Sequence, residues 1–139
     1  MIIQCFGKKK NAIAITTAKK GSGKIKINGV PINLVHPLDI KNKILEPFFI
    51  LGSNERLNLN FDIFSKGGGK VSQIYAIRQS ISKCLVFYYY KYISASKSNL
   101  LKIKYLTYDK KLLISDVSRI EPKKYGGLGA RARFQKSYR

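Results

Sequence analysis

The longest periodic pattern of apolar residues in the chain follows three consecutive glycines, Gly67 to Gly69. Beyond them apolar residues recur at steps of three or four positions, at Val71, Ile74, Ile77, Ile81, Leu85, Tyr88 and Tyr92. This spacing is the period of one face of an α-helix, and a helix of that length would extend roughly 30 Å. The pattern predicts a long central helix that packs against the core, preceded by a glycine turn. The free N–H groups at such a helix start favour anions, and Lys70 lies there.

Short apolar and β-branched runs before this helix predict strands. We expect strands at residues 2–6, 12–18 and 24–28, joined as an antiparallel meander through two lysine-rich turns. Strict alternation of apolar and polar residues from Leu57 to Phe64 predicts a further, half-buried strand.

Three more segments complete the expected order of elements. Asp39 to Leu51 has the spacing of an amphipathic helix, which Pro47 should kink or shorten. Residues 100–108 predict another helix, and residues 112–114 a last short strand. This order predicts an α+β fold, a two-layer sandwich of one mostly antiparallel sheet with helices on one face.

The charge of the chain narrows the class of partner. Lysine and arginine number 27 against seven acidic residues, a formal net charge of +20. Such a chain repels itself and is most stable beside a polyanion, with nucleic acid first and an anionic membrane surface second. No apolar run reaches the roughly 18 residues of a spanning helix, and the apolar start is too short for a signal peptide. Cys5 and Cys84 lie far apart, which favours a reduced, cytosolic chain.

The character of the sequence changes after Asp116. We therefore divide it into a globular domain, residues 1–116, and an extended basic C-terminal tail, residues 117–139. The tail is rich in lysine, arginine and glycine, and its few apolar residues follow no period, so we expect it to be disordered alone. Tyr125, Phe134 and Tyr138 alternate with its cations, a composition suited to RNA stacking and phosphate contact.

Catalytic and metal-binding patterns do not emerge. Gly21-Ser22-Gly23-Lys24 resembles part of a phosphate-binding P-loop, but Ala18 and Ile25 stand where that motif needs glycine and a hydroxyl residue. His36 is the only histidine, and the seven acids are scattered. We expect no enzymatic activity, no cofactor, no metal and no small-molecule substrate.

Two long motifs resemble a known family. The blocks that carry the resemblance are Gly67-Gly68-Gly69, Ser72-Gln73, Ala76 to Lys83 with Leu85, and Tyr125 to Arg139; Phe6 to Lys10, Lys26 to Pro31 and Leu45 to Pro47 also fit. They resemble the universal small-subunit ribosomal protein nine family, whose eukaryotic form is called protein sixteen of the small subunit. Cys84 and Leu128 depart from it, since the family usually has alanine and proline there.

This resemblance implies a fold shared with the second domain of ribosomal protein five, with a left-handed βαβ crossover. It implies a structural constituent of the small (40S) ribosomal subunit, in the cytoplasm, bound to 18S-type rRNA and neighbouring proteins in the subunit head. The family's tail threads through rRNA so that its last residues reach the peptidyl-site tRNA. An alternative from the charge alone is a non-ribosomal module that binds polyanions on chromatin or an anionic membrane surface.

The predicted contact residues are cations of the turns, the helix and the tail. For rRNA they are Lys8, Lys9, Lys10, Lys19, Lys20, Lys24, Lys70, Arg78, Lys123, Lys124, Arg131 and Arg133. For tRNA, the positions that match the family's last residues are Lys136 and Arg139.

Overall fold

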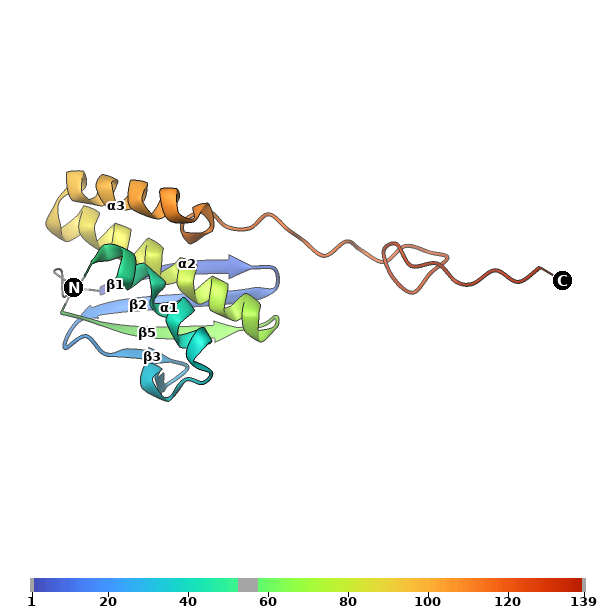
Figure 1. Cartoon of the computed structure of the whole chain (residues 1–139), viewed down its shortest axis with the longest axis horizontal. Coiled ribbons are helices and arrows are strands. Elements are labelled where there is room, and N and C mark those ends of the chain that lie inside the picture. The colour runs from blue at the N-terminus through green and yellow to red at the C-terminus, as the bar shows by residue number, and fades with distance from the viewer. Residues whose placement is uncertain (1, 53–57, 139) are drawn as a thin grey trace.

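The computed structural model describes residues 2–52 and 58–138 and is an α+β fold built on one five-stranded sheet (Figure 1). Its strands are β1 (Ile2–Lys9), β2 (Ala12–Lys20), β3 (Ile25–Ile27), β4 (Val30–Pro31) and β5 (Leu59–Lys66). Its helices are α1 (Leu38–Leu51), α2 (Lys70–Tyr88) and α3 (Ala95–Tyr108), with short turns η1 (Ile32–Leu34), η2 (Tyr89–Ile93) and η3 (Lys110–Leu112).

The sheet order is β1-β2-β5-β3-β4, so the predicted meander of the first three strands is wrong. β5 lies between β2 and β3, antiparallel to β2 and parallel to β3. Two parallel neighbours need a crossover connection, and α1 supplies it between β3 and β5. β2 and β5 pair over eight positions, whereas β3 is three residues long. The longer ladder therefore forms between β2 and β5, which sequence order does not reveal.

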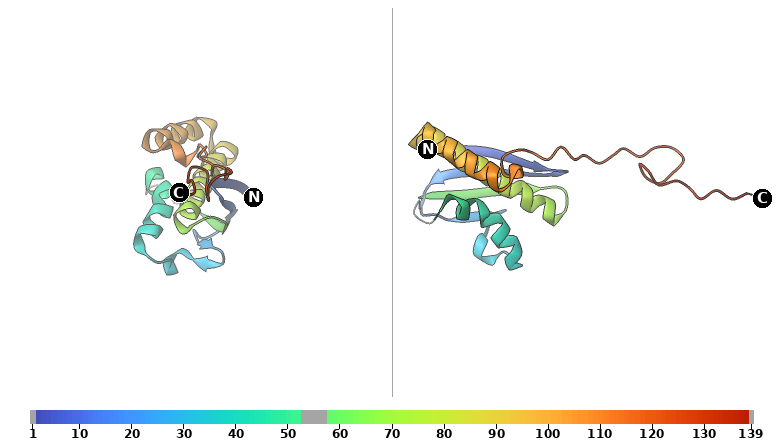
Figure 2. Two further views of the ribbon diagram at one scale, coloured as in Figure 1. Left: turned by 90° about the vertical axis from the view of Figure 1, so that its right-hand side faces the viewer. Right: turned by 45° about the horizontal axis from the view of Figure 1, so that its top comes forward.

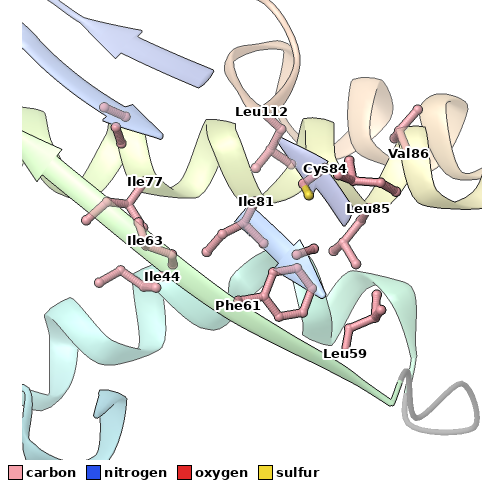
Figure 3. Packing of buried hydrophobic residues seen from close by; sticks show 14 of the residues in the cluster. Ile44, Leu59, Phe61, Ile63, Ile77, Ile81, Cys84, Leu85, Val86 and Leu112 are labelled. Carbon is pink, nitrogen blue, oxygen red and sulfur yellow. The ribbon is translucent and has the colours of Figure 1, made fainter. Parts of the chain in front are cut away.

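The three helices cover one face of the sheet, as predicted, and leave the other face bare (Figures 1 and 2). α2 lies across β1 and β2, with α1 and α3 on its two sides. Inward-facing residues of the strands meet α1 and α2, and the rings of Phe48 and Phe61 pack edge to face with centroids 5.2 Å apart. Ile77 and Ile81 of α2 lie above Ile63 and Phe61 of β5 in this core (Figure 3).

The central helix α2 is buried on more sides than the single row of apolar residues from Val71 to Tyr92, its apolar stripe, predicts. Gln79, Ser80 and Ser82, which lie off the stripe, are all buried. Ser80 Oγ is 2.6 Å from Thr16 Oγ1, and Ser82 Oγ donates to the Arg78 carbonyl at 2.9 Å. These hydroxyls are tolerated because each has a hydrogen-bond partner. The stripe is wrong at its two ends, since Val71 is exposed and Tyr92 lies beyond α2 in η2.

The remaining predicted elements differ mainly at their boundaries. α1 continues past Pro47 to Leu51, and the carbonyl of Pro47 accepts a hydrogen bond from the buried Tyr105 hydroxyl at 2.8 Å. Burial raises the pKa of Tyr105, which keeps this hydroxyl a donor. α3 begins at Ala95, before the predicted start. β5 runs to Lys66, while Leu57, the predicted start of this strand, lies outside the described residues.

The predicted last strand at residues 112–114 is wrong. Its place is taken by the single turn η3, in which the Asp109 carboxylate accepts a hydrogen bond from the Lys111 N–H at 2.8 Å. Leu112 of this turn is fully buried against the core. The hydrogen bond from the Lys111 N–H to the Asp109 side chain thus favours a helical turn here, although the apolar residues 112–114 have a high propensity for a β-strand.

Residues 113–138 form no helix or strand; Leu113 still packs against the core, and the later part of this segment leads away from the body as a long arm (Figure 1). Across the part of the chain that the structure describes, none of the helices has the length and apolar character needed to cross a membrane.

Candidate nucleic-acid interface

The turn between β1 and β2 is the first part of a cationic surface at one end of the sheet. Lys8 and Lys10 on this turn are exposed, and Lys10 takes a positive φ of 53° that closes the turn. Lys9 faces the helical side instead, because successive side chains of a strand point to opposite faces. The predicted three-lysine cluster therefore offers two outward ammonium groups.

The start of α2 lies directly beside this turn. Gly67 has a φ of +78°, and a Cβ on it would lie 2.5 Å from the Asn11 carbonyl oxygen. Only glycine allows so close an approach in this backbone region. The helix start has no side-chain cap at Gly69, and Lys70, its first residue, is exposed. The first N–H groups of a helix favour an anion, and an exposed lysine at that position adds a positive charge nearby.

The root of the tail is the third segment at this end. Asp116 pairs with the Lys9 ammonium and also accepts the Ser118 N–H at 3.0 Å. The hydrogen bond from Lys9 and that from Ser118 hold the pKa of Asp116 well below its usual range. A groove of about 580 Å³ lies between the turn and the tail root, lined by Lys8, Lys10, Asn11 and residues 115–120. Because Asp116 pairs with Lys9, the other charged residues that line the groove are the cations Lys8, Lys10 and Arg119.

The tail carries a closed loop rather than a uniformly extended chain. The Phe134 N–H donates to the Gly126 carbonyl at 3.0 Å, which ties the two ends of the loop together. Inside it the backbones approach so closely that a Cβ on Gly127 would lie 1.6 Å from the Ala132 oxygen. Arg131, predicted to contact rRNA, forms a two-pronged ion pair with Glu121 in the structure, at 2.7 and 3.0 Å.

The other predicted tail residues are free of such pairing among the described residues. Lys123, Lys124, Arg133 and Lys136 are exposed along the arm. The Arg133 guanidinium donates to the neighbouring Ala132 carbonyl at 3.1 Å. Arg139, predicted to contact tRNA, lies outside the described residues.

The second lysine turn lies at the opposite end of the sheet from the first. Asn60 of β5 fixes this turn, since its Oδ1 accepts the N–H groups of Ser22 and Lys24 at 2.9 and 3.0 Å. Lys19, Lys20 and Lys24 are exposed on it. The structure therefore separates the two lysine turns by the length of β2.

Arg78 was predicted to contact rRNA, but the structure buries it inside the body, where RNA cannot reach it. Its side chain is only 3% exposed. Nε lies 2.6 Å from Glu46 Oε2 in a close charge contact that is poorly aligned for a hydrogen bond. NH1 donates to Asp109 Oδ2 at 2.8 Å. Arg78 thus joins α1, α2 and the end of α3.

Sequence reasoning also missed cations at the tail-root end. Lys66 ends β5 on its outward face, paired in register with Ile13, and Arg119 lines the groove. The alternation of β5, continued two residues beyond Phe64, would have placed Lys66 on that face. No sequence signal brings Arg119 to the turn, because its position depends on the Lys9–Asp116 pair.

Other kinds of site are not evident. Within residues 2–52 and 58–138, no group of three histidine, cysteine or acidic side chains is arranged to hold a metal ion. Exposed cations at the turns, the helix start and the arm form the main feature of the described surface, and they suit phosphate groups.

Comparison with known proteins identifies the family of this chain. A family model described as ribosomal protein S9/S16 matches residues 7–139. The small ribosomal subunit protein uS9 of Debaryomyces hansenii is 50% identical over 137 residues, which cover 99% of this chain and 96% of the relative. The uS9 protein of Dictyostelium discoideum is 48% identical over 138 residues, 99% of this chain and 94% of the relative. These matches confirm the resemblance carried by the two long motifs, and the chain belongs to the ribosomal protein S9/S16 family.

Proposed function

We propose that this chain is a structural constituent of the small (40S) ribosomal subunit, in the cytoplasm, and that it binds 18S-type rRNA in the subunit head together with neighbouring ribosomal proteins. The family and the names of the relatives support a place in the small subunit. The observation that carries the RNA contact is the convergence of the β1–β2 turn, the start of α2 and the tail root at one cationic end.

This end offers phosphates a set of fixed positions. Lys8, Lys10, Lys70 and Arg119 are exposed on three backbone segments that hold one another in place. A preorganised set loses less side-chain entropy on binding than cations on a mobile loop. Lys19, Lys20 and Lys24 form a separate contact at the far end of the sheet.

The tail is proposed to continue this contact into the RNA and to reach the peptidyl-site tRNA. Its cations at Lys123, Lys124, Arg133 and Lys136 would bind phosphates along the way, and Lys136 with Arg139 would contact the tRNA backbone. Phosphate contacts carry no base identity, as a site that serves every tRNA requires. The family resemblance, rather than the geometry, supports the tRNA contact.

Co-sedimentation with small subunits in moderate salt tests the proposal against a polyanion module that acts outside the ribosome. The full chain should co-sediment stoichiometrically, and a chain that binds any polyanion but no subunit would contradict the ribosomal role. Replacing both Lys8 and Lys10 by alanine should reduce the slope of log affinity against log salt by about 0.7 to 0.9 for each phosphate that the variant no longer binds. Lys43→Ala is a suitable control, because Lys43 pairs with Glu46 on the helical side.

Deleting Arg139 tests the tRNA contact. We expect subunits that assemble normally but release peptidyl-site tRNA somewhat faster, because one cation no longer holds the tRNA backbone. Unaltered tRNA release from such subunits would leave the tail as an rRNA anchor alone.

A further inference from the structure

The face of the sheet opposite the helices carries the same short pattern on two strands. β1 contains Phe6-Gly7-Lys8 and β5 contains Phe64-Ser65-Lys66. In both, the phenylalanine and the lysine point away from the helices, because residues two apart share a face of a strand. Phe6 and Phe64 are 61% and 56% exposed.

The pairing register places these patterns side by side. Phe6 pairs with Ile15 of β2, and Ile15 pairs with Phe64, so the two phenylalanines lie in one row, with their backbones about 10 Å apart, two strand spacings. The next row is Lys8, Ile13 and Lys66, again in register. β1 and β5 run in the same direction, since each is antiparallel to β2. The face thus presents a row of two aromatic rings beside a row with two ammonium groups.

We propose that this face, defined by Phe6, Phe64, Lys8 and Lys66, binds an unpaired RNA segment, with bases stacked on the two rings and phosphates on the two lysines. Exposed aromatic side chains on an open sheet are suited to unstacked bases, and stacking accepts any base. The proposal rests on the proposed RNA-binding function and adds a base-contacting face beside the cationic end, whose lysines would bind phosphates.

Charge favours RNA over a protein as the occupant. The outward residues of the face include Lys8, Lys19, Lys26 and Lys66 against the single acid Asp62. Asp62 lies in register with Lys26, which offsets its charge. From α2, Lys83 reaches the edge strand and places its ammonium 5.2 Å from the centre of the Phe6 ring. Because this cation lies over one face of the Phe6 ring, a base would stack on the other face of the ring.

Continuity with the cationic end gives the RNA a path. The lysine row is the one nearer the β1–β2 turn, because Lys8 and Lys66 follow Phe6 and Phe64 along strands that end at that turn and at the start of α2. A strand of RNA could therefore pass from the groove at the tail root onto the sheet and contact lysine or arginine side chains along the whole path.

The test measures the affinity of the full chain for a short oligouridylate and for an abasic strand of equal length and charge. Replacing Phe6 and Phe64 together by leucine should weaken oligouridylate binding by on the order of 5- to 140-fold for each stacked base. Affinity for the abasic strand and the salt slope should stay unchanged. Phe49→Leu is the matched control, since Phe49 is similarly exposed but lies on α1.

Each other outcome overturns the proposal in a recognisable way. If the double variant binds both strands as the wild type does, the rings do not stack on bases. If the variant keeps its RNA affinity but no longer incorporates into subunits, the face contacts a protein instead. After either failure, the Lys8→Ala/Lys10→Ala variant shows whether the proposed function fails as well: the expected decrease in salt slope would leave the phosphate-binding surface in place.

Discussion

Lys9 and Asp116 are 107 residues apart in sequence, and their side chains form an ion pair between the end of β1 and the root of the tail. The pair lies beside Lys8 and Lys10, so the arm leaves the body at its most cationic end. An arm attached elsewhere would begin its path away from the phosphates that the turn binds. The pair therefore fastens the start of the arm to this end of the body.

Breaking this pair should loosen the root of the tail without unfolding the body. In Asp116→Asn and Lys9→Ala we expect lower ¹⁵N{¹H} nuclear Overhauser values for residues 117–121 and little change in thermal unfolding. Lys110→Ala, which removes an exposed lysine of η3, is the control. Unchanged values in both variants would show that other contacts hold the root.

Removing Arg78 should destabilise the body severely. Arg78→Ala leaves Glu46 and Asp109 near each other without their shared cation, and removing one partner of a buried ion pair costs about 3–5 kcal/mol. Urea denaturation measures this effect. Arg119→Ala, an exposed site, should change stability by no more than about 0.5 kcal/mol. A stable Arg78→Ala variant with weakened RNA binding would instead support an RNA contact for Arg78.

Acid should weaken the fold. Burial alone would raise the pKa of Asp109, but hydrogen bonds from the Lys111 N–H and from Arg78 outweigh it and hold that pKa below its ordinary value. A depressed carboxyl pKa contributes stability above the unfolded value, and the contribution is lost as pH falls through the folded pKa. Unfolding free energy should therefore decrease as the pH falls below about 5.

The acid sensitivity can be assigned by substitution. Asp109→Asn should be less stable near neutral pH and show a shallower loss in acid than the wild type. A wild-type slope in Asp109→Asn would place the titrating carboxyl elsewhere.

The globular domain should fold without its tail. Leu112 is the last fully buried apolar residue of the described chain, and the arm beyond it extends away from the core. A chain that ends after Ser118 keeps the Lys9–Asp116 pair and should unfold cooperatively at nearly the wild-type temperature. Failure of this truncated chain to fold would show that the tail belongs to the core and that the boundary at residue 116 is wrong.

The loop in the arm should depend on one glycine. Gly127→Ala places a methyl group where only 1.6 Å separates it from the Ala132 oxygen, so the loop must open. Gly129→Ala is the matched control, because the added Cβ would make an ordinary contact of 3.8 Å. Hydrogen exchange of the Phe134 amide should accelerate in the first variant only, and equal exchange in both would exclude the closed loop in solution.

The sequence predicts local elements of this fold better than their pairing. The spacing from Ile74 to Leu85 identifies α2 because one helix face meets the core. β5 lies between β2 and β3 because β2 forms a longer hydrogen-bonded ladder with β5 than it could form with the short β3. The alternation of residues within one strand does not indicate which other strand it pairs with.

The sequence predicts which cations are exposed when their exposure depends only on their position in a turn. It does not predict which cations are paired with an acidic residue that is distant in the sequence. Exposed lysines of the turns follow from composition and turn position. The burial of Arg78 depends on Asp109, 31 residues away, and on Glu46 of another helix. The inward direction of Lys9 could have been read from the alternation of β1, but its partner Asp116 could not.

The closed loop between Gly126 and Phe134 bears on the order in which a ribonucleoprotein is assembled. A fully extended peptide is narrow enough to be drawn lengthwise through a gap in folded RNA, whereas a chain doubled back on itself is wider than the segments on either side. For an arm enclosed by rRNA, as proposed above, the loop either opens during entry or is in place before the surrounding helices close. In the second case the loop is wider than the gap in the RNA through which the arm passes, so it blocks withdrawal of the arm. The arm would then stay in place even while its individual phosphate contacts exchange.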